Sequence, residues 1–206
     1  MKGFVKTIPT YYRKIAWTQP TLTSNGSFGG NEMGVEAHAL GSYSSAYNLD
    51  RPYAAFSSNA ENLSLYGNEF RVTMYVNIYI PVSLVLTKIS FTVKHLEAAS
   101  GGVYNGCIWG DISKNSKTTA LMAFNYVPDD NNNHSFETPN NIIPFQYYTF
   151  QVSAGGWVDE DLVTISNILL EGFTPQVSDE LNYDYVINSY NCKLPKIDNR
   201  YYAVKG

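Results

Sequence analysis

The sequence has few charged residues, two cysteines and no long apolar run. Charged residues make up 16% of its 206 residues, against about a quarter in an average globular protein. Lysine and arginine form no basic block, so the electrostatic signature of a nucleic-acid-binding protein is missing. No stretch has the roughly 20 apolar residues of a membrane-spanning helix, and the N-terminal segment lacks the apolar run of a signal peptide. We therefore expect no nucleic-acid partner, no membrane insertion and no signal-directed secretion.

Motifs for catalysis and for transition-metal binding are also lacking. Cys107 and Cys192 lie far apart and fit no metal-ligand spacing. We expect both to be reduced thiols packed as small apolar groups, and a disulfide that closes a long loop is the alternative. The three histidines are scattered, and no Gly-x-Ser-x-Gly or phosphate-binding glycine loop occurs. The sequence therefore predicts a protein that is not an enzyme. A glycosidase carboxylate pair is the alternative, because its geometry is tertiary.

Aromatic residues and short polar residues are what the sequence has in abundance. Aromatics make up 15% of the chain, including 17 tyrosines. The segment Glu69–Ile80 alternates strictly between apolar and other residues, which predicts a strand with one buried face. The tyrosines on its second face suggest that this face is covered too, and a partner subunit is one candidate for the cover. Pro81 lacks a backbone donor and is expected to end the strand.

Other short runs separated by turn residues predict further strands. A change of phase between Leu84–Leu86 and Ile89–Val93 predicts a bulge or turn near Thr87–Lys88. The polar run Asp129–Asn133 reads as a loop. Further strands are predicted at Val103–Trp109, Ala120–Tyr126, Tyr147–Val152 and Val163–Glu171. Evenly spaced short strands are typical of an antiparallel β-sandwich or barrel.

Several segments, in order, resemble one known family. They are Trp17–Gly26 (WTQPTLTSNG) followed by Gly29-Gly30-Asn31, Tyr53–Phe56 (YAAF), Cys107–Asp111 (CIWGD), Tyr147–Val152 and Val163–Gly172. Their order and spacing resemble the discoidin-like (galactose-binding-like) jelly-roll domains of bacteriophage virion and tail proteins. The resemblance implies an all-β antiparallel sandwich. The resemblance covers a sandwich at 17–173. Residues 1–16 read as a lead-in segment, and the Tyr- and Asn-rich residues 174–206 as an extension that packs on the sandwich or on a partner subunit.

The resemblance also implies a function. A virion structural protein is expected, associated with the tail, the head decoration or a fibre, and acting in host-surface attachment or subunit assembly. Its location would be the virion, and its partners would be other virion proteins, copies of itself in a homo-oligomer, and a host cell-surface glycan. The alternative is a carbohydrate-binding module that recognises bacterial surface polysaccharide without catalysis.

Oxygen-rich loops raise the question of a metal ion. The runs Asp129–Asn133, Asp159–Asp161 and Asn59–Asn62 supply carboxylate and amide oxygens, but none has the spacing of a defined calcium loop. The family has an aspartate after its Ala-Phe pair, whereas Ser57 follows Phe56 here. We therefore predict no cofactor, with calcium in one of these loops as the alternative.

Sugar-binding sandwiches stack aromatic rings on sugars beside polar groups, and five residues fit that chemistry. The candidate ligand-binding residues are Trp109, Trp157, Tyr53, Asp111 and Asn131. The alternative is that the rings belong to the core or to a subunit interface, where tyrosine and tryptophan are enriched. For Trp17 we expect core packing.

Overall fold

The computed structural model describes residues 12–40, 46–47, 49–56, 63–67, 72–95, 102–114, 116–128, 130–138, 141–154, 161–177, 196–197 and 200–201. The chain divides into a unit of Ile15–Pro175 and a second unit formed by its two ends. In the second unit, β12 (Lys196–Ile197) pairs antiparallel with β13 (Arg200–Tyr201). None of the described segments forms a helix long and apolar enough to cross a membrane.

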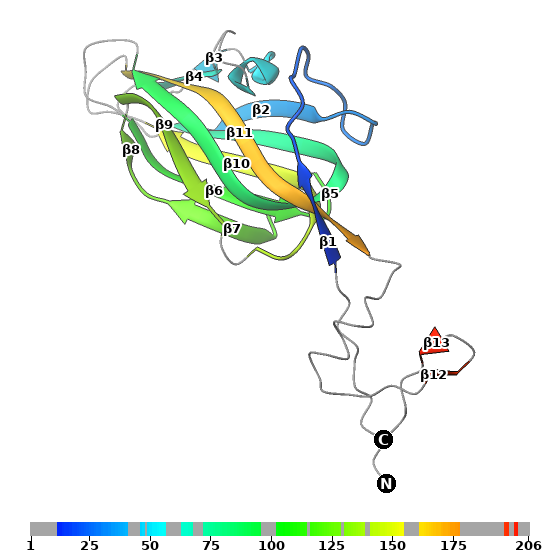
Figure 1. Cartoon of the computed structure of the whole chain (residues 1–206). Coiled ribbons are helices and arrows are strands. Elements are labelled where there is room, and N and C mark those ends of the chain that lie inside the picture. Colours follow the sequence, from blue (N-terminus) through cyan, green and yellow to red (C-terminus); the bar gives the residue numbers. More distant parts are fainter. Residues whose placement is uncertain are drawn as a thin grey trace. The chain divides into compact units, whose positions relative to one another are not determined.

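The Ile15–Pro175 unit is an antiparallel β-sandwich organised by one long strand, β5 (Val72–His95), which is shared by both sheets (Figure 1). Four strands pair antiparallel with it: β2 (Gly34–Leu40) and β10 (Phe145–Ala154) along its first half, and β9 (Asp130–Glu137) and β11 (Asp161–Val177) along its second half. This arrangement confirms the predicted all-β antiparallel sandwich.

The remaining strands extend the two sheets. The first sheet continues from β10 through β6 (Gly102–Asp111) to β7 (Thr119–Phe124), and β8 (Val127–Pro128) pairs with β6. The second sheet continues from β11 through β4 (Leu63–Gly67) to β3 (Ala46–Tyr47), and β1 (Tyr12–Trp17) pairs with β11. One short 3-10 helix, η1 (Pro52–Phe56), follows β3.

The prediction that Pro81 ends its strand is wrong, because β5 continues through it. Pro81 lies where β5 passes from one sheet to the other. The register with β10 moves from Tyr79↔Tyr147 to Leu84↔Phe145, and the residues between have no partner on β10. A proline at this bend therefore removes no ladder hydrogen bond. The side-chain amide of Gln146 donates to the Pro81 carbonyl at 3.1 Å, which satisfies that acceptor.

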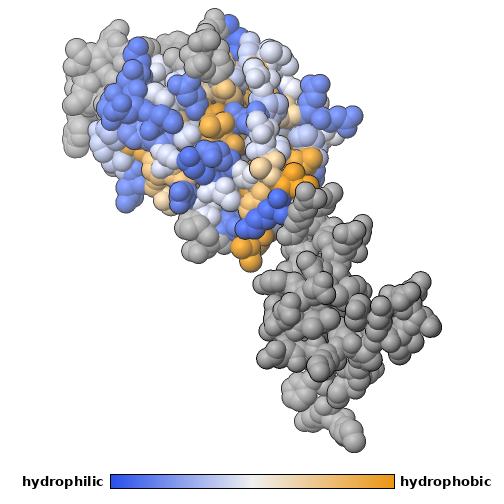
Figure 2. All heavy atoms as spheres, in the orientation of Figure 1, coloured by the Kyte–Doolittle hydropathy of each residue, from blue (hydrophilic) through white to orange (hydrophobic). Residues whose placement is uncertain are grey.

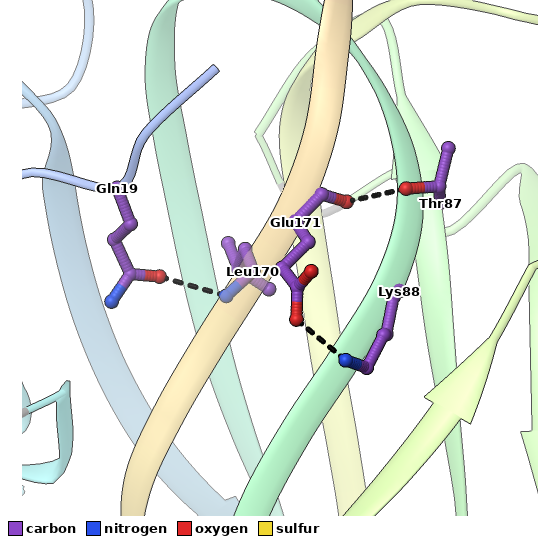
Figure 3. A network of polar contacts seen from close by, with 5 residues as sticks. All are labelled: Gln19, Thr87, Lys88, Leu170 and Glu171. Carbon is purple, nitrogen blue, oxygen red and sulfur yellow. Dashed lines mark hydrogen bonds and ion pairs between the residues drawn. The ribbon is translucent and has the colours of Figure 1, made fainter. Parts of the chain in front are cut away.

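The predicted bulge near Thr87–Lys88 is confirmed. Along β11, Lys88 pairs with Glu171 and Leu86 pairs with Gly172, so Thr87 is the extra residue. Its hydroxyl donates to the Glu171 carbonyl at 3.0 Å, and the Lys88 ammonium lies 2.7 Å from the Glu171 carboxylate (Figure 3). The polar side chains on both sides of the bulge thus hold β5 against β11.

The prediction of a loop at Asp129–Asn133 is wrong for the described residues of this run. Asp130–Asn133 begin β9, where Asn133 pairs with Thr92 and Asp130 pairs with Lys94 of β5. Backbone pairing needs no apolar side chain. The three asparagines are exposed, so the strand forms without burying polar groups.

The apolar residues of the long strand form the centre of the core. Met74, Val76, Ile78 and Ile80 are fully buried. In the second half of β5, Phe91 lies at the middle of a ring cluster, with centroid distances of 5.0 to 5.6 Å to Phe150, Phe124 and Phe136. Burying each of these large side chains contributes on the order of 2 kcal/mol.

The second face of β5 is covered by the chain itself. Tyr75 and Tyr79 are less than 10% exposed. The Lys117 ammonium lies 3.4 Å from the centroid of the Tyr75 ring, and the Phe28 ring packs 6.1 Å from that of Tyr79. Two loops of the same chain therefore cover this face, for which a partner subunit was one candidate.

Candidate functional site

The segment that follows β1 is fastened to the sandwich by a glutamine. The Gln19 side chain donates to the Ile168 carbonyl at 3.0 Å. It also accepts from the Leu170 backbone N–H at 2.9 Å (Figure 3). Ile168 follows Asn167, which has a positive φ of 54°, inside the irregularity of β11 between Ser166 and Leu169, and Leu170 lies just after it. The bulge opens the backbone groups that Gln19 then satisfies, so Trp17 and the residues after Gln19 are held at a defined place.

The same segment is fastened again at Asn25. The side-chain amide of Asn25 donates to the Asp50 carbonyl at 2.7 Å, and the backbone carbonyl of Asn25 accepts from the Val35 N–H at 2.7 Å. The next residue, Gly26, has φ of 62°, and a Cβ there would lie 2.2 Å from the Met33 carbonyl oxygen. Only glycine fits this turn, which brings the segment back against the start of β2.

A pocket of about 420 Å³ lies between these fixed points. This volume is within the range of about 300–1,000 Å³ that is usual for small-molecule sites. Its described lining comes from three parts of the chain: the segment between Trp17 and Gly26, the residues just before β2, and the bend of β5. The lining residues are Trp17, Pro20, Thr21, Leu22, Thr23, Ser24, Gly26, Asn31, Glu32, Met33 and Pro81.

The pocket combines an apolar wall with polar groups at its rim. Trp17 and Leu22 are half-buried and pack against the core, while Met33 is buried. The exposed polar residues are Thr21, Thr23, Ser24, Asn31 and Glu32. No hydrogen bond joins their side chains to another described residue of the chain. The rim therefore offers hydroxyl, amide and carboxylate groups to a ligand.

Two of the predicted ligand residues, Trp109 and Asp111, lie elsewhere, on the outer face of the first sheet. Trp109 is partly exposed, and its indole nitrogen is buried without a partner among the described residues. Asp111 is buried, and its carboxylate accepts three hydrogen bonds of 2.5 to 2.9 Å from Lys117 and Thr118. In this structure the Asp111 oxygens are occupied by the loop that follows β6.

The other predicted ligand residues are separated from these two. Tyr53 is partly exposed in η1, where its N–H lies 3.5 Å from the side-chain oxygen of Asn25. Asn131 is exposed on β9 and has φ of 60°. Trp157 lies outside the described residues. None of the four described candidates is among the residues that line the pocket.

Asp130 forms a small polar cluster on β9. Hydrogen bonds from Asn132 and then from His134 lower the pKa of the Asp130 carboxyl to about 2. The His134 ring nitrogen lies 2.8 Å from that carboxylate. Among the described residues, no group of three or more His, Cys, Asp or Glu side chains is arranged to hold a metal ion.

Of the two cysteines, the structure describes one. Cys107 is a buried free thiol on β6, and burial raises its pKa. Cys192 lies outside the described residues.

The lining of the pocket was missed by sequence reasoning. Trp17 does pack against the core as expected, but it also faces the pocket. Glu32 carried no signal, and Asn31 entered only through the family resemblance, because their place in the pocket lining depends on how the chain turns back at Gly26. Pro81, nearly fifty residues further along, closes the third side. The one available clue was the dense group of turn residues between Ser24 and Asn31.

On the face seen in Figure 2, hydrophilic residues dominate and hydrophobic ones gather in small groups. The large apolar side chains that are most exposed among the described residues include Ile112 and Ile142, at 84% and 82%. Ile112 follows the end of β6 and Ile142 precedes β10. Neither lines the pocket.

Comparisons with known proteins give likenesses of fold. No protein-family model and no curated protein matches the chain. Among solved structures it is similar to the CBM32-3 module of a family 31 glycoside hydrolase from Clostridium perfringens, at 16% identity over 67% of this chain and 90% of that chain, with a TM-score of 0.47.

Two other solved structures are similar. One is the family 32 carbohydrate-binding module of NanJ from C. perfringens in complex with galactose (11% identity, 66% of this chain, 93% of that chain, TM-score 0.44). The other is the F5/8 type C domain of a Bacteroides fragilis protein (10% identity, 69% of this chain, 92% of that chain, TM-score 0.43). At these identities and scores the likenesses describe a sandwich and carry no argument about function.

Proposed function

We propose that this chain is a non-catalytic carbohydrate-binding module, that its pocket between Trp17, Glu32 and Pro81 holds the sugar, and that its natural ligand is a bacterial surface polysaccharide. The observation that carries the proposal is the composition of the pocket: an indole and aliphatic wall beside hydroxyl, amide and carboxylate groups that form no hydrogen bond with another described residue. A pyranose has the complementary surfaces, with apolar C–H groups on its faces and hydroxyls around its edge.

The pocket can recognise a sugar without a rearrangement of its frame. Gln19 and Asn25 fix the segment on both sides of the lining hydroxyls, so little backbone ordering is needed on binding. Glu32 offers two carboxylate oxygens to sugar hydroxyls, and such charge-assisted hydrogen bonds contribute about 1.5–3 kcal/mol each. Glu32→Ala should therefore weaken binding by at least about tenfold.

A glycan array followed by calorimetric titration tests the proposal. The array should identify bacterial glycans that bind the wild-type chain. Glu32→Ala should weaken the same titration, while the matched Glu137→Ala, which removes an exposed carboxylate of β9 outside the pocket lining, should not. Absence of binding to every glycan would contradict the proposal.

Variants of the residues predicted from the sequence locate the site. Trp109→Ala should leave the affinity within about threefold of wild type, a change of less than 1 kcal/mol, because Trp109 does not line the pocket. Trp157→Ala is titrated beside it to test the other predicted indole. A large loss in either variant, with Glu32→Ala unaffected, would move the site away from the pocket. Turnover assays on a bound polysaccharide should detect no cleavage.

A virion role is our second proposal, supported by the resemblance of the Trp17–Asn31 segment to virion sandwich domains. This role is compatible with sugar binding, because a virion protein that attaches to the host surface has to bind a molecule there. Mass measurement in solution and imaging of purified particles test this role. A stable monomer that is absent from particles would contradict it.

A further inference from the structure

The charge of the pocket points to the class of sugar that it takes. Glu32 is the one charged side chain among the described residues that line the pocket. Its side chain is exposed at the rim. The other described polar groups of the lining are neutral hydroxyls and an amide.

One cation near this part of the fold, Lys114, is already engaged. Lys114, on the loop after β6, places its ammonium 2.5 Å from the Glu36 carboxylate and 4.6 Å from the centre of the Phe28 ring. Lys114 is not a lining residue. Its charge is offset by Glu36, so it does not balance Glu32. The chain as a whole carries a formal net charge of −4, which adds to the negative potential.

Building on the proposed function, we propose that Glu32 makes the pocket select sugars by charge: sugars with a free amine bind best, neutral sugars bind next, and acidic sugars are rejected. An ammonium group beside Glu32 forms an ion pair at the rim. A sugar carboxylate in the same place is a like charge without a compensating cation among the described lining residues. Because the rim is exposed, each step in the series should amount to about three- to tenfold in affinity.

Salt separates this electrostatic selection from a selection by shape. The distance over which charges act in solution falls from about 30 Å at 0.01 M salt to about 3 Å at 1 M. The preference for amine-bearing over acidic sugars should therefore shrink as salt rises. The affinity for a neutral sugar should hardly change.

The test is calorimetric titration with matched methyl glycosides: glucosamine, glucose and glucuronic acid, and the corresponding galacto series. Wild type should bind them in the order amine, neutral, acid, at low salt. Glu32→Gln keeps the hydrogen-bonding shape of the side chain and should bring the three affinities within about twofold of one another, a difference of less than 0.5 kcal/mol. Glu137→Gln removes the same unit of charge outside the pocket and should keep the order.

The outcomes distinguish this inference from the proposed function. Sugar binding that follows no charge order, or an order that survives in Glu32→Gln, would overturn the inference while the module still binds sugar. An order lost equally in Glu137→Gln would assign the effect to net charge and would also overturn it. If neither series of methyl glycosides binds, and no oligosaccharide on the array binds either, the inference and the proposed function are both overturned.

Discussion

Replacing Asp111 with alanine should destabilise the sandwich without affecting sugar binding. The buried carboxylate accepts hydrogen bonds from the Lys117 N–H at 2.9 Å, the Thr118 N–H at 2.5 Å and the Thr118 hydroxyl at 2.8 Å. These bonds close the loop that brings Lys117 over the Tyr75 ring. Lys117 itself has a φ of 47°, a conformation that costs a non-glycine residue about 1 kcal/mol or more.

The magnitude follows from these three contacts. Hydrogen bonds to a charged group contribute about 1.5–3 kcal/mol each. Their sum overestimates the loss, because Thr118 is exposed and water can satisfy its donors once the carboxylate is gone. We expect Asp111→Ala to lower the free energy of unfolding by about 2–4 kcal/mol, and Tm by about 5–15 °C. Asp111→Asn keeps one acceptor and should fall between alanine and wild type.

Urea unfolding followed by circular dichroism measures this loss, and titration with a bound glycan measures the affinity. Affinity should stay at the wild-type value under conditions where the variant is folded, since Asp111 does not line the pocket. A loss of stability below about 0.5 kcal/mol would refute the reasoning, because surface substitutions alone produce changes of that size. Lost binding at unchanged stability would instead support the role predicted from the sequence, that of a ligand residue.

Three further perturbations should have measurable effects. Gly110→Ala should cost about 1–3 kcal/mol by urea unfolding, because its new Cβ would lie 2.4 Å from the Phe145 ring; an unchanged midpoint would contradict this close packing. Tyr148→Phe should cost about 1–3 kcal/mol, since it leaves the buried Leu84 carbonyl without its hydroxyl donor; calorimetric Tm would show no change if that bond were unimportant. Burial, and then the nearby lysine charges, lower the pKa of His38 below 6.5. The unfolded chain therefore binds a proton more readily than the folded chain, and the free energy of unfolding should fall as the pH drops below about 6.5. If the free energy of unfolding of His38→Gln depends on pH as steeply as that of wild type, this residue is not the cause.

The sandwich was predictable because its signal is local. Alternation from Val72 to Ile80 fixes which side chains face the core, and the phase change at Thr87 marks the bulge. The errors have a common cause. Pro81 and the asparagines of β9 are unfavourable for a strand by residue type, but tertiary pairing and the bend between sheets override that preference.

The pocket was not predictable from sequence, because it depends on contacts between distant residues. Gln19 meets Leu170 across 151 positions, and no sequence pattern reports such a contact. Aromatic and acidic residues near glycine turns were the signal available, and it indicated Trp109 and Asp111. The structure gives the Asp111 carboxylate internal partners and places Glu32 at the rim of a pocket, where no described residue binds its carboxylate.

The most direct test of the central claim is backbone and indole NMR of the wild-type chain, titrated with the tightest-binding glycan from the array. Binding in the pocket predicts the largest shift changes at the Trp17 indole N–H and at the amides of Gly26, Asn31, Glu32 and Met33, with the loop after Asp111 nearly unchanged. Saturating shift changes centred on Trp109, Trp157 or Asn131, with the pocket signals unmoved, would contradict it.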